Sequence, residues 1–350
     1  MPSFRRRALA LGALAAPALL RAGAARAQET TVLRLHHFLP AVSNVHRFFL
    51  QPWAEKVRSE SGGKLRIQIF PAMQLGGAPP QLYDQARDGV ADIIWTLPGN
   101  TPGRFPKIEV FELPFVSHKR AIVNCRAVQD YADRHLRDEF AEVHPLCVWG
   151  HGEGLIHSRR EVKAMEDLRG LKLRFPSRLN GEALRALGAA PVGMPVPQIP
   201  EALSQGVIDG AVVPWEVVPA LRLQEMVKNH TEVPGSPTLY ITTFILAMNP
   251  AKYASLPEEL RKVLDANSGQ AAATMAAVPW DERGPVVEEM VRKRGNQITV
   301  ISEAEKARWV QATQPVIDTW LAQARERGLD APALLADARA LVAKYGEGVA

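Results

Sequence analysis

Short apolar runs alternate with longer amphipathic stretches through the first 150 residues, and this pattern predicts strands and helices in turn. Ser43 is placed to cap the first helix, and Gly62 and Gly63 to end it. The predicted strands are 32–36, 65–70, 91–96 and a run around Leu146, and the predicted helices are 44–60, 79–88 and 119–140. This alternation is typical of an α/β fold.

A second unit with the same alternation begins near Gly150. From Pro257 the pattern turns helical almost to the end, with a break expected at Gly284-Pro285. The predicted strands of this unit are 171–175, 210–213, 238–248 and 297–301, and its first helices are 180–187 and 200–204.

Two helix-to-strand turns share one sequence pattern. One helix ends at Gly89 and leads through Asp92 into an apolar strand, and another ends at Gly206 and leads through Asp209 into a second strand. Glycine tolerates the left-handed backbone that ends many helices. Two α/β lobes built on one plan would produce this repeat, and the cleft between such lobes is a natural ligand site. Two unrelated turns are the alternative.

The N-terminus has the order of a secretory signal peptide. Three arginines precede an apolar run over 8–20, and Ala25-Arg26-Ala27 fits a cleavage site, so we assign residues 1–27 to the signal and expect export to the periplasm. The apolar run is too short to cross a bilayer, which needs about 20 residues, although a membrane anchor stays an alternative. Both the Sec and the twin-arginine route fit the basic start.

The signal also accounts for the basic balance of the chain. The full sequence has 42 Lys and Arg against 37 Asp and Glu, but residues 1–27 hold five arginines and no acid, so the mature chain has no net charge. A nucleic-acid partner is therefore not expected. The remaining length exceeds that of one ordinary core, which favours two lobes. Cys125 and Cys147 read as buried free thiols, with a disulfide as the alternative in an oxidising compartment.

Motifs of the common enzyme classes are not found in the chain. It lacks the Gly-x-Ser-x-Gly elbow, the His-Glu-x-x-His helix, the Cys-x-x-Cys pair and the Gly-Lys-Ser/Thr phosphate loop. None of its histidines has the spacing of a zinc site, and we expect them to line a cleft or the surface. The sequence therefore predicts no catalytic residue, no cofactor and no structural metal, and argues against a secreted α/β enzyme.

Several segments resemble the solute-binding subunits of TRAP (tripartite ATP-independent periplasmic) transporters of the C4-dicarboxylate-binding type. The most specific is 167–176, which matches an Asp-Leu-x-Gly-x-Lys-x-Arg-x-Pro motif. The resemblance covers about 30–310. Weaker matches are the Gln-Leu-Gly segment at 74–76, the Leu-Pro-Phe motif at 113–115, Leu-Gly-Ala at 187–189 and the segment 202–210.

The resemblance implies a two-lobed periplasmic-binding-protein fold with a hinge and a long inter-lobe helix. It places 28–150 with about 242–280 in one lobe, 151–241 with about 281–316 in the other, and about 317–350 in a C-terminal helical segment. It also implies closure around a ligand and delivery to a small and a large membrane subunit, driven by an ion gradient.

Arg174 is the position that the family uses to hold a ligand carboxylate. A guanidinium binds a carboxylate through two parallel charged hydrogen bonds, which suits this role. Pro176 stops the strand just after it. The alternative is a solvated arginine in an ordinary salt bridge.

The chain departs from the sialic-acid binders of the family. Gly154 stands where they carry a second arginine, and Val213 where they carry an asparagine, so an acidic sugar is not expected. An apolar or aromatic monocarboxylate suits the replacements better. Candidate contacts by resemblance and chemistry are Trp215, Phe38 and Trp95 as walls, Ser177 as a hydroxyl donor, Glu153 or Tyr240 as readers of a ligand hydroxyl, and Glu216 as a contact for an accompanying cation.

The leading hypothesis is therefore a periplasmic TRAP binding protein for a small organic acid. Three rivals stay open: an exported input protein for a signalling receptor, the binding protein of an ATP-driven transporter, and a secreted α/β enzyme.

Overall fold

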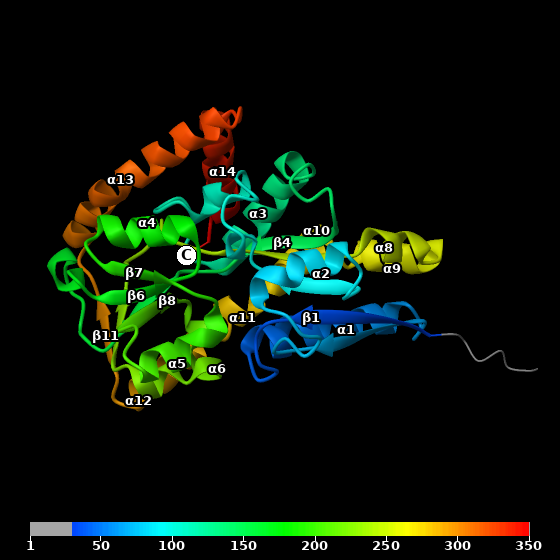
Figure 1. Cartoon of the computed structure of the whole chain (residues 1–350), viewed down its shortest axis with the longest axis horizontal. Helices are drawn as coiled ribbons and strands as arrows, with labels where there is room; N and C mark the ends of the chain where they lie inside the picture. Colours follow the sequence, from blue (N-terminus) through cyan, green and yellow to red (C-terminus); the bar gives the residue numbers. More distant parts are fainter. Residues whose placement is uncertain (1–29, 350) are drawn as a thin grey trace, which may run out of the picture.

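A computed structural model describes residues 30–349 of the chain and shows two α/β lobes, each built on its own sheet (Figure 1). The signal peptide assigned to residues 1–27 lies outside the described residues. Lobe I contains the sheet that begins with β1, and lobe II contains the sheet that begins with β5.

The sheet of lobe I has five strands in the order β2-β1-β3-β10-β4. Strands β2, β1 and β3 are parallel, whereas β10 runs antiparallel to both of its neighbours. Because β10 is far along the sequence, the chain must leave lobe I, build lobe II and return. The bounds are β1 Thr31–His37, β2 Leu65–Phe70, β3 Ile93–Thr96, β4 His144–Gly150 and β10 Thr243–Met248.

The sheet of lobe II has six strands in the order β11-β9-β5-β8-β6-β7. Its centre mixes directions, since β5 is antiparallel to β8 and β9 while β6 is parallel to β7 and β8. The bounds are β5 Leu155–Ser158, β6 Lys172–Phe175, β7 Ala190–Gly193, β8 Gly210–Val213, β9 Asn229–Glu232 and β11 Gln297–Val300.

Helices pack on both sheets. In lobe I these include α1 Gln51–Glu60, α2 Leu82–Arg87, α3 Ala121–His135, α8 Pro250–Ser255, α9 Glu258–Ala266 and α10 Gly269–Ala276. In lobe II they include α4 Arg178–Ala186, α5 Ile199–Ser204, α6 Val218–Leu221, α7 Leu223–Met226 and α12 Gly284–Lys293. None of the described helices is long and apolar enough to cross a membrane.

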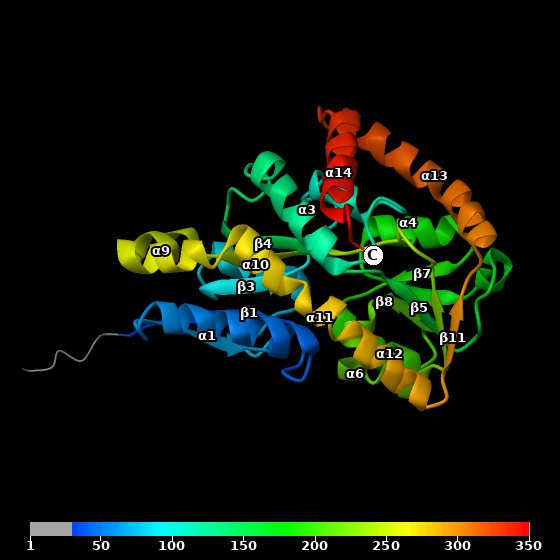
Figure 2. The same ribbon diagram turned by 180° about the vertical axis from the view of Figure 1, so that it is seen from behind.

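Three segments connect the lobes. Two are extended, between β4 and β5 and between β9 and β10. The third is helical: α10, α11 (Val278–Asp281) and α12 follow one another from lobe I to lobe II (Figure 2). The long helix expected between the lobes therefore occurs as three consecutive segments. The helix was expected to break at Gly284-Pro285, but the break lies two residues earlier, at Glu282 and Arg283. Gly284 and Pro285 instead form the start of α12, because a proline is tolerated in the first turn of a helix.

The repeated turn performs the same task in both lobes. Gly89 and Gly206 have φ of +76° and +70°, the left-handed backbone predicted for them. The Asp92 carboxylate then accepts a hydrogen bond of 2.8 Å from the backbone N–H of Arg34 at the neighbouring strand β1. The Asp209 carboxylate accepts one of 3.0 Å from Lys172 at β6. In each lobe an aspartate thus fixes one parallel strand beside the next.

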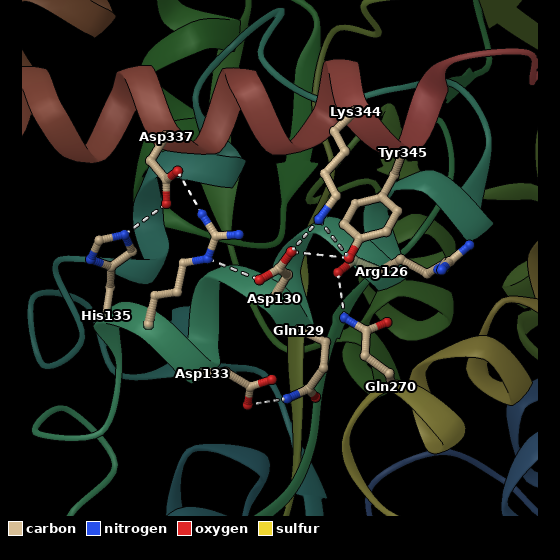
Figure 3. A network of polar contacts seen from close by, with 10 residues as sticks. Arg126, Gln129, Asp130, Asp133, His135, Gln270, Asp337, Lys344 and Tyr345 are labelled. Carbon is tan, nitrogen blue, oxygen red and sulfur yellow. Dashed lines mark hydrogen bonds and ion pairs between the residues drawn. The ribbon is translucent and has the colours of Figure 1, made fainter.

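The C-terminus forms a two-helix arm across both lobes. Helix α13 (Glu303–Glu326) contacts α4 of lobe II, and α14 (Ala331–Gly346) packs along α3 of lobe I. Asp337 of α14 contacts His135 at 2.8 Å, while Asp130 of α3 accepts hydrogen bonds from Lys344 and Tyr345 (Figure 3). The boundary expected near residue 317 falls inside α13.

Both cysteines are free and buried. The Cys125 thiol donates to the carbonyl of Gly150 at 3.0 Å, and burial raises the pKa of both thiols well above the usual value. The interpretation as inert core thiols agrees with this geometry.

Candidate ligand-binding site

A small cavity of about 40 Å³ lies between the lobes. Lobe I supplies the residues just after β1, the end of β3 and the start of β10, and lobe II supplies the ends of β6 and β8. Strand ends that face a crevice are the usual place for ligands in such sheets. The lining residues are Phe38, Leu39, Trp95, Leu97, His151, Arg174, Pro176, Val196, Val212, Val213, Pro214, Glu216, Val217, Tyr240, Thr242 and Phe244.

Arg174 is the cationic side chain of the cavity. It lies on β6 and only 1% of its surface is exposed. Its Nε donates to the Met194 carbonyl at 2.9 Å and its Nη1 to the Val212 carbonyl at 3.3 Å. Among the described residues no ion pair includes it, and burial lowers its pKa to about 10, so it stays charged at neutral pH. The structure therefore holds an oriented, uncompensated positive charge inside the protein.

Aromatic rings cover the lobe I side. The Phe38 and Trp95 ring centroids are 4.7 Å apart, and those of Trp95 and Phe244 are 5.7 Å apart. Trp149 stacks behind Trp95 at 6.3 Å and keeps this wall in place. The indole N–H of Trp95 has no hydrogen-bond partner within the described residues. Planar apolar surface with one free donor suits an aromatic or apolar ligand body.

Tyr240 lies in the returning segment between β9 and β10 and is 3% exposed. Its hydroxyl has no hydrogen-bond partner among the described residues, and burial raises its pKa above the usual value. A side chain at position 154 would clash with this ring, since an added Cβ would lie 2.1 Å from the Tyr240 Cζ. This close approach explains in steric terms why position 154 is a glycine and cannot carry a second arginine.

His151 is a neutral member of the lining. Its Nδ1 donates to the Gly152 carbonyl at 2.6 Å and its Nε2 accepts from the Thr242 N–H at 2.8 Å, so both ring nitrogens are occupied. Burial lowers its pKa to about 4. His151 therefore joins the two extended connections between the lobes without adding charge.

Glu216 faces the same cavity from lobe II. It follows β8 in a short helical turn, is 4% exposed, and its Oε2 has no hydrogen-bond partner in the described structure. Burial raises its pKa well above the usual value. The described residues contain no group of three or more His, Cys, Asp and Glu side chains arranged for a metal ion.

Three predicted contacts lie outside this cavity. Trp215 and Glu153 line a neighbouring hollow of about 280 Å³, and the Trp215 indole donates to Glu232 at 2.9 Å, which turns the ring away from Arg174. Ser177 lines a third hollow on the other side of Pro176, and its Oγ accepts from Asn180 at 2.7 Å. The cavity does collect Arg174, Phe38, Trp95, Tyr240 and Glu216.

Sequence reasoning missed Phe244 and Thr242 as lining residues, whereas His151 lines the cavity as one of the histidines expected at a cleft or the surface. Phe244 sits in an apolar strand that any sheet core would contain, so the pattern alone carried no signal. His151 follows β4 directly, and its place between two lobes was the available clue. Four of the other eight histidines, expected at a cleft or surface, are instead buried as hydrogen-bonded pairs: His37 with His46, and His157 with His230.

The chain matches a known protein family and several solved structures. Residues 35–324 match the family model described as bacterial extracellular solute-binding protein, family 7. A TRAP solute-binding protein from Rhodoferax ferrireducens, in complex with copurified benzoate, is 43% identical, with 92% of this chain and 100% of that chain covered and a TM-score of 0.89.

Two further solved structures are similar. One is a marine-metagenome TRAP protein specific for aromatic acid ligands, with 3-hydroxybenzoate bound (44% identity, 91% and 99% coverage, TM-score 0.88). The other is from Bordetella bronchiseptica, with (R)- and (S)-mandelate bound (29% identity, 90% and 99% coverage, TM-score 0.83).

Proposed function

The chain belongs to family 7 of the bacterial extracellular solute-binding proteins, the TRAP solute-binding proteins, and on that premise we propose that it captures aromatic monocarboxylates in the cavity between its lobes. The carboxylate binds Arg174, and the ring lies against Phe38, Trp95 and Phe244. Three relatives with bound benzoate, 3-hydroxybenzoate and mandelate support this ligand class.

The buried, unpaired guanidinium of Arg174 carries the proposal. An isolated charge in a protein interior is costly unless a counter-charge arrives. The two carbonyls that hold it aim it without neutralising it. A ligand carboxylate supplies the missing charge and two acceptor oxygens, and the Tyr240 hydroxyl is a further donor for it.

The number of charges favours a monocarboxylate over a C4-dicarboxylate. Among the residues that line the cavity Arg174 is the one with a positive charge at neutral pH, because His151 is held neutral. A second carboxylate would enter an aromatic, water-poor space without a partner.

Export and delivery complete the proposed role. We infer that residues 1–27 are removed near Ala27 and that the protein works in the periplasm. It then passes its ligand to the small and large membrane subunits of a TRAP transporter for gradient-driven uptake. The protein itself performs no chemical conversion in this proposal.

Titration calorimetry of the mature protein with benzoate, mandelate, succinate and benzamide tests the proposal. Benzoate or mandelate should bind, whereas succinate and the uncharged benzamide should bind far more weakly. Arg174→Ala should cost about 2–5 kcal/mol of binding free energy, because a buried charged partner is lost. Lys172→Ala, an exposed change on the same strand, is the matched control and should bind normally. Tight succinate binding, or normal benzoate binding by Arg174→Ala, would refute the proposal.

A further inference from the structure

Glu216 is the acidic side chain that shares the cavity with Arg174. Its backbone carbonyl accepts a hydrogen bond of 2.7 Å from the Asn44 side chain of lobe I. This contact joins the two lobes beside the cavity. The position of Glu216 is therefore fixed when the lobes are together.

The carboxyl group of Glu216 lacks the partners that its neighbours have. The adjacent Trp215 is hydrogen-bonded to Glu232, but the Glu216 Oε2 is buried and unpartnered, and no ion pair in the described part of the chain includes Glu216. A buried polar atom without a partner has lost its hydrogen bonds to water and gained none in exchange. A ligand group that meets this oxygen offsets that loss.

Charge decides which ligand group fits. The Glu216 carboxyl group is buried and forms no ion pair within the described residues, which favours its neutral acid form. Burial accordingly raises its pKa. A neutral carboxyl has one O–H donor and one carbonyl acceptor. A hydroxyl likewise donates one hydrogen bond and accepts others, so it matches a protonated Glu216 in both directions.

Tyr240 lines the same cavity as Arg174 and Glu216. The hydroxyl of Tyr240 is itself buried and unpartnered. The cavity thus offers a ligand three polar groups, which are the Arg174 guanidinium, the Tyr240 hydroxyl and the Glu216 carboxyl.

We propose that Glu216 is a specificity-determining residue that reads a hydroxyl group on the ring of the bound aromatic acid. This inference rests on the proposed function, since it takes the carboxylate to be held by Arg174. It makes hydroxy-substituted aromatic monocarboxylates the preferred class and assigns the preference to one side chain.

Calorimetry with benzoate, 3-hydroxybenzoate, 4-hydroxybenzoate and 3-methylbenzoate tests this assignment at neutral pH. The wild type should bind at least one hydroxybenzoate about fivefold or more tighter than benzoate, and tighter than the methyl compound of similar size. Glu216→Leu should remove that preference, so that the hydroxybenzoates bind no tighter than benzoate and 3-methylbenzoate do. Glu216→Gln keeps a neutral donor and acceptor and should retain most of the preference. Glu153→Gln, a change to another buried carboxyl in the neighbouring hollow, should leave it intact.

The outcomes separate the two proposals. If the wild type binds none of these acids, the proposed function fails. If benzoate binds but the hydroxyl and methyl compounds bind equally, or Glu216→Leu leaves the preference unchanged, the Glu216 assignment alone fails. Binding that requires added Na⁺ in the wild type but not in Glu216→Gln would replace the hydroxyl with a cation. The ligand series needs no variant, so a wild type without a hydroxyl preference overturns the assignment even if Glu216→Leu does not fold. If the preference is present, Glu216→Gln and Glu216→Leu decide whether it belongs to Glu216.

Discussion

Phe38, Trp95 and Phe244 bring aromatic carbon to the cavity from lobe I, whereas Arg174 and Glu216 bring charge and acid from lobe II. The two lobes nevertheless share one feature, since each contains a buried, hydrogen-bonded histidine pair. Under the proposed function this difference divides recognition between the lobes: lobe II would select the charged end of a ligand and lobe I its apolar body. A ligand satisfies both only when the lobes meet, which couples binding to closure.

The largest expected effect comes from changing the geometry of the lobe II charge without removing the charge. The Arg174 guanidinium donates to the Met194 and Val212 carbonyls and, in the proposed complex, also to the ligand carboxylate. In Arg174→Lys a single ammonium group replaces this guanidinium. Benzoate affinity should fall by on the order of a hundredfold, because a lysine cannot present parallel donors. Calorimetry measures the loss. A change below about threefold would mean that charge alone, not the pair of donors, is recognised.

The next expected effect is on the free energy of unfolding, and it concerns the histidine pair of lobe II, His157 with His230. Burial lowers the pKa of His230 to about 4, against an ordinary value of 6.5. The unfolded chain therefore takes up the proton first, and the stability from this group is present above pH 6.5 and is lost as pH falls towards 4. The loss for His230 between pH 7 and 5 should be about 2 kcal/mol. Urea unfolding of the wild type and His230→Gln at both pH values should show a smaller drop in the variant.

Glu153 provides a control with the opposite sign. Burial raises its pKa to about 7, against 4.5 ordinarily, even though Lys119 lies 3.1 Å away and opposes the shift. The folded chain therefore takes up this proton first, and its contribution to stability is lost as pH rises from 4.5 through 7. Glu153→Gln should steepen the acid-side drop that His230→Gln reduces. The same change of slope in both variants would contradict these assignments.

The smallest expected effect is on the lobe I wall. Trp95→Phe keeps an aromatic ring but reduces the surface that the ligand covers, so benzoate affinity should fall by about 1 kcal/mol. The preference for benzoate over benzamide should not change, because it belongs to Arg174. Calorimetry with both compounds checks this. A loss of that preference would show that the two walls do not act separately.

Most strands were predictable from the sequence, and β9 shows how polar core residues can hide one. The predictions for 65–70 and 210–213 match β2 and β8 because apolar residues occupy their buried positions. Strand β9, Asn229–Glu232, was missed although its last three residues are buried. His230 and Thr231 are satisfied there by hydrogen bonds to His157 and Val162, so polar residues occupy positions that a periodicity argument reserves for apolar ones.

The candidate site was partly predictable for a similar reason. Arg174 was found because a specific motif surrounds it, and the structure places it in the cavity. Trp215 was expected beside it, but Glu232, which is 17 residues away in sequence, holds its indole in the neighbouring hollow. A partner this distant in sequence leaves no local pattern near Trp215. Phe244 was missed because it lies in an entirely apolar strand, where nothing distinguishes a lining residue from a core residue.

The two carbonyls that hold Arg174 have a consequence for the empty receptor. They orient the guanidinium without a ligand, so under the proposed function the empty closed form would carry an electrostatic penalty that the loaded form would not. Closing without cargo is therefore disfavoured, and a membrane permease that responds to the closed shape would seldom meet an unloaded receptor.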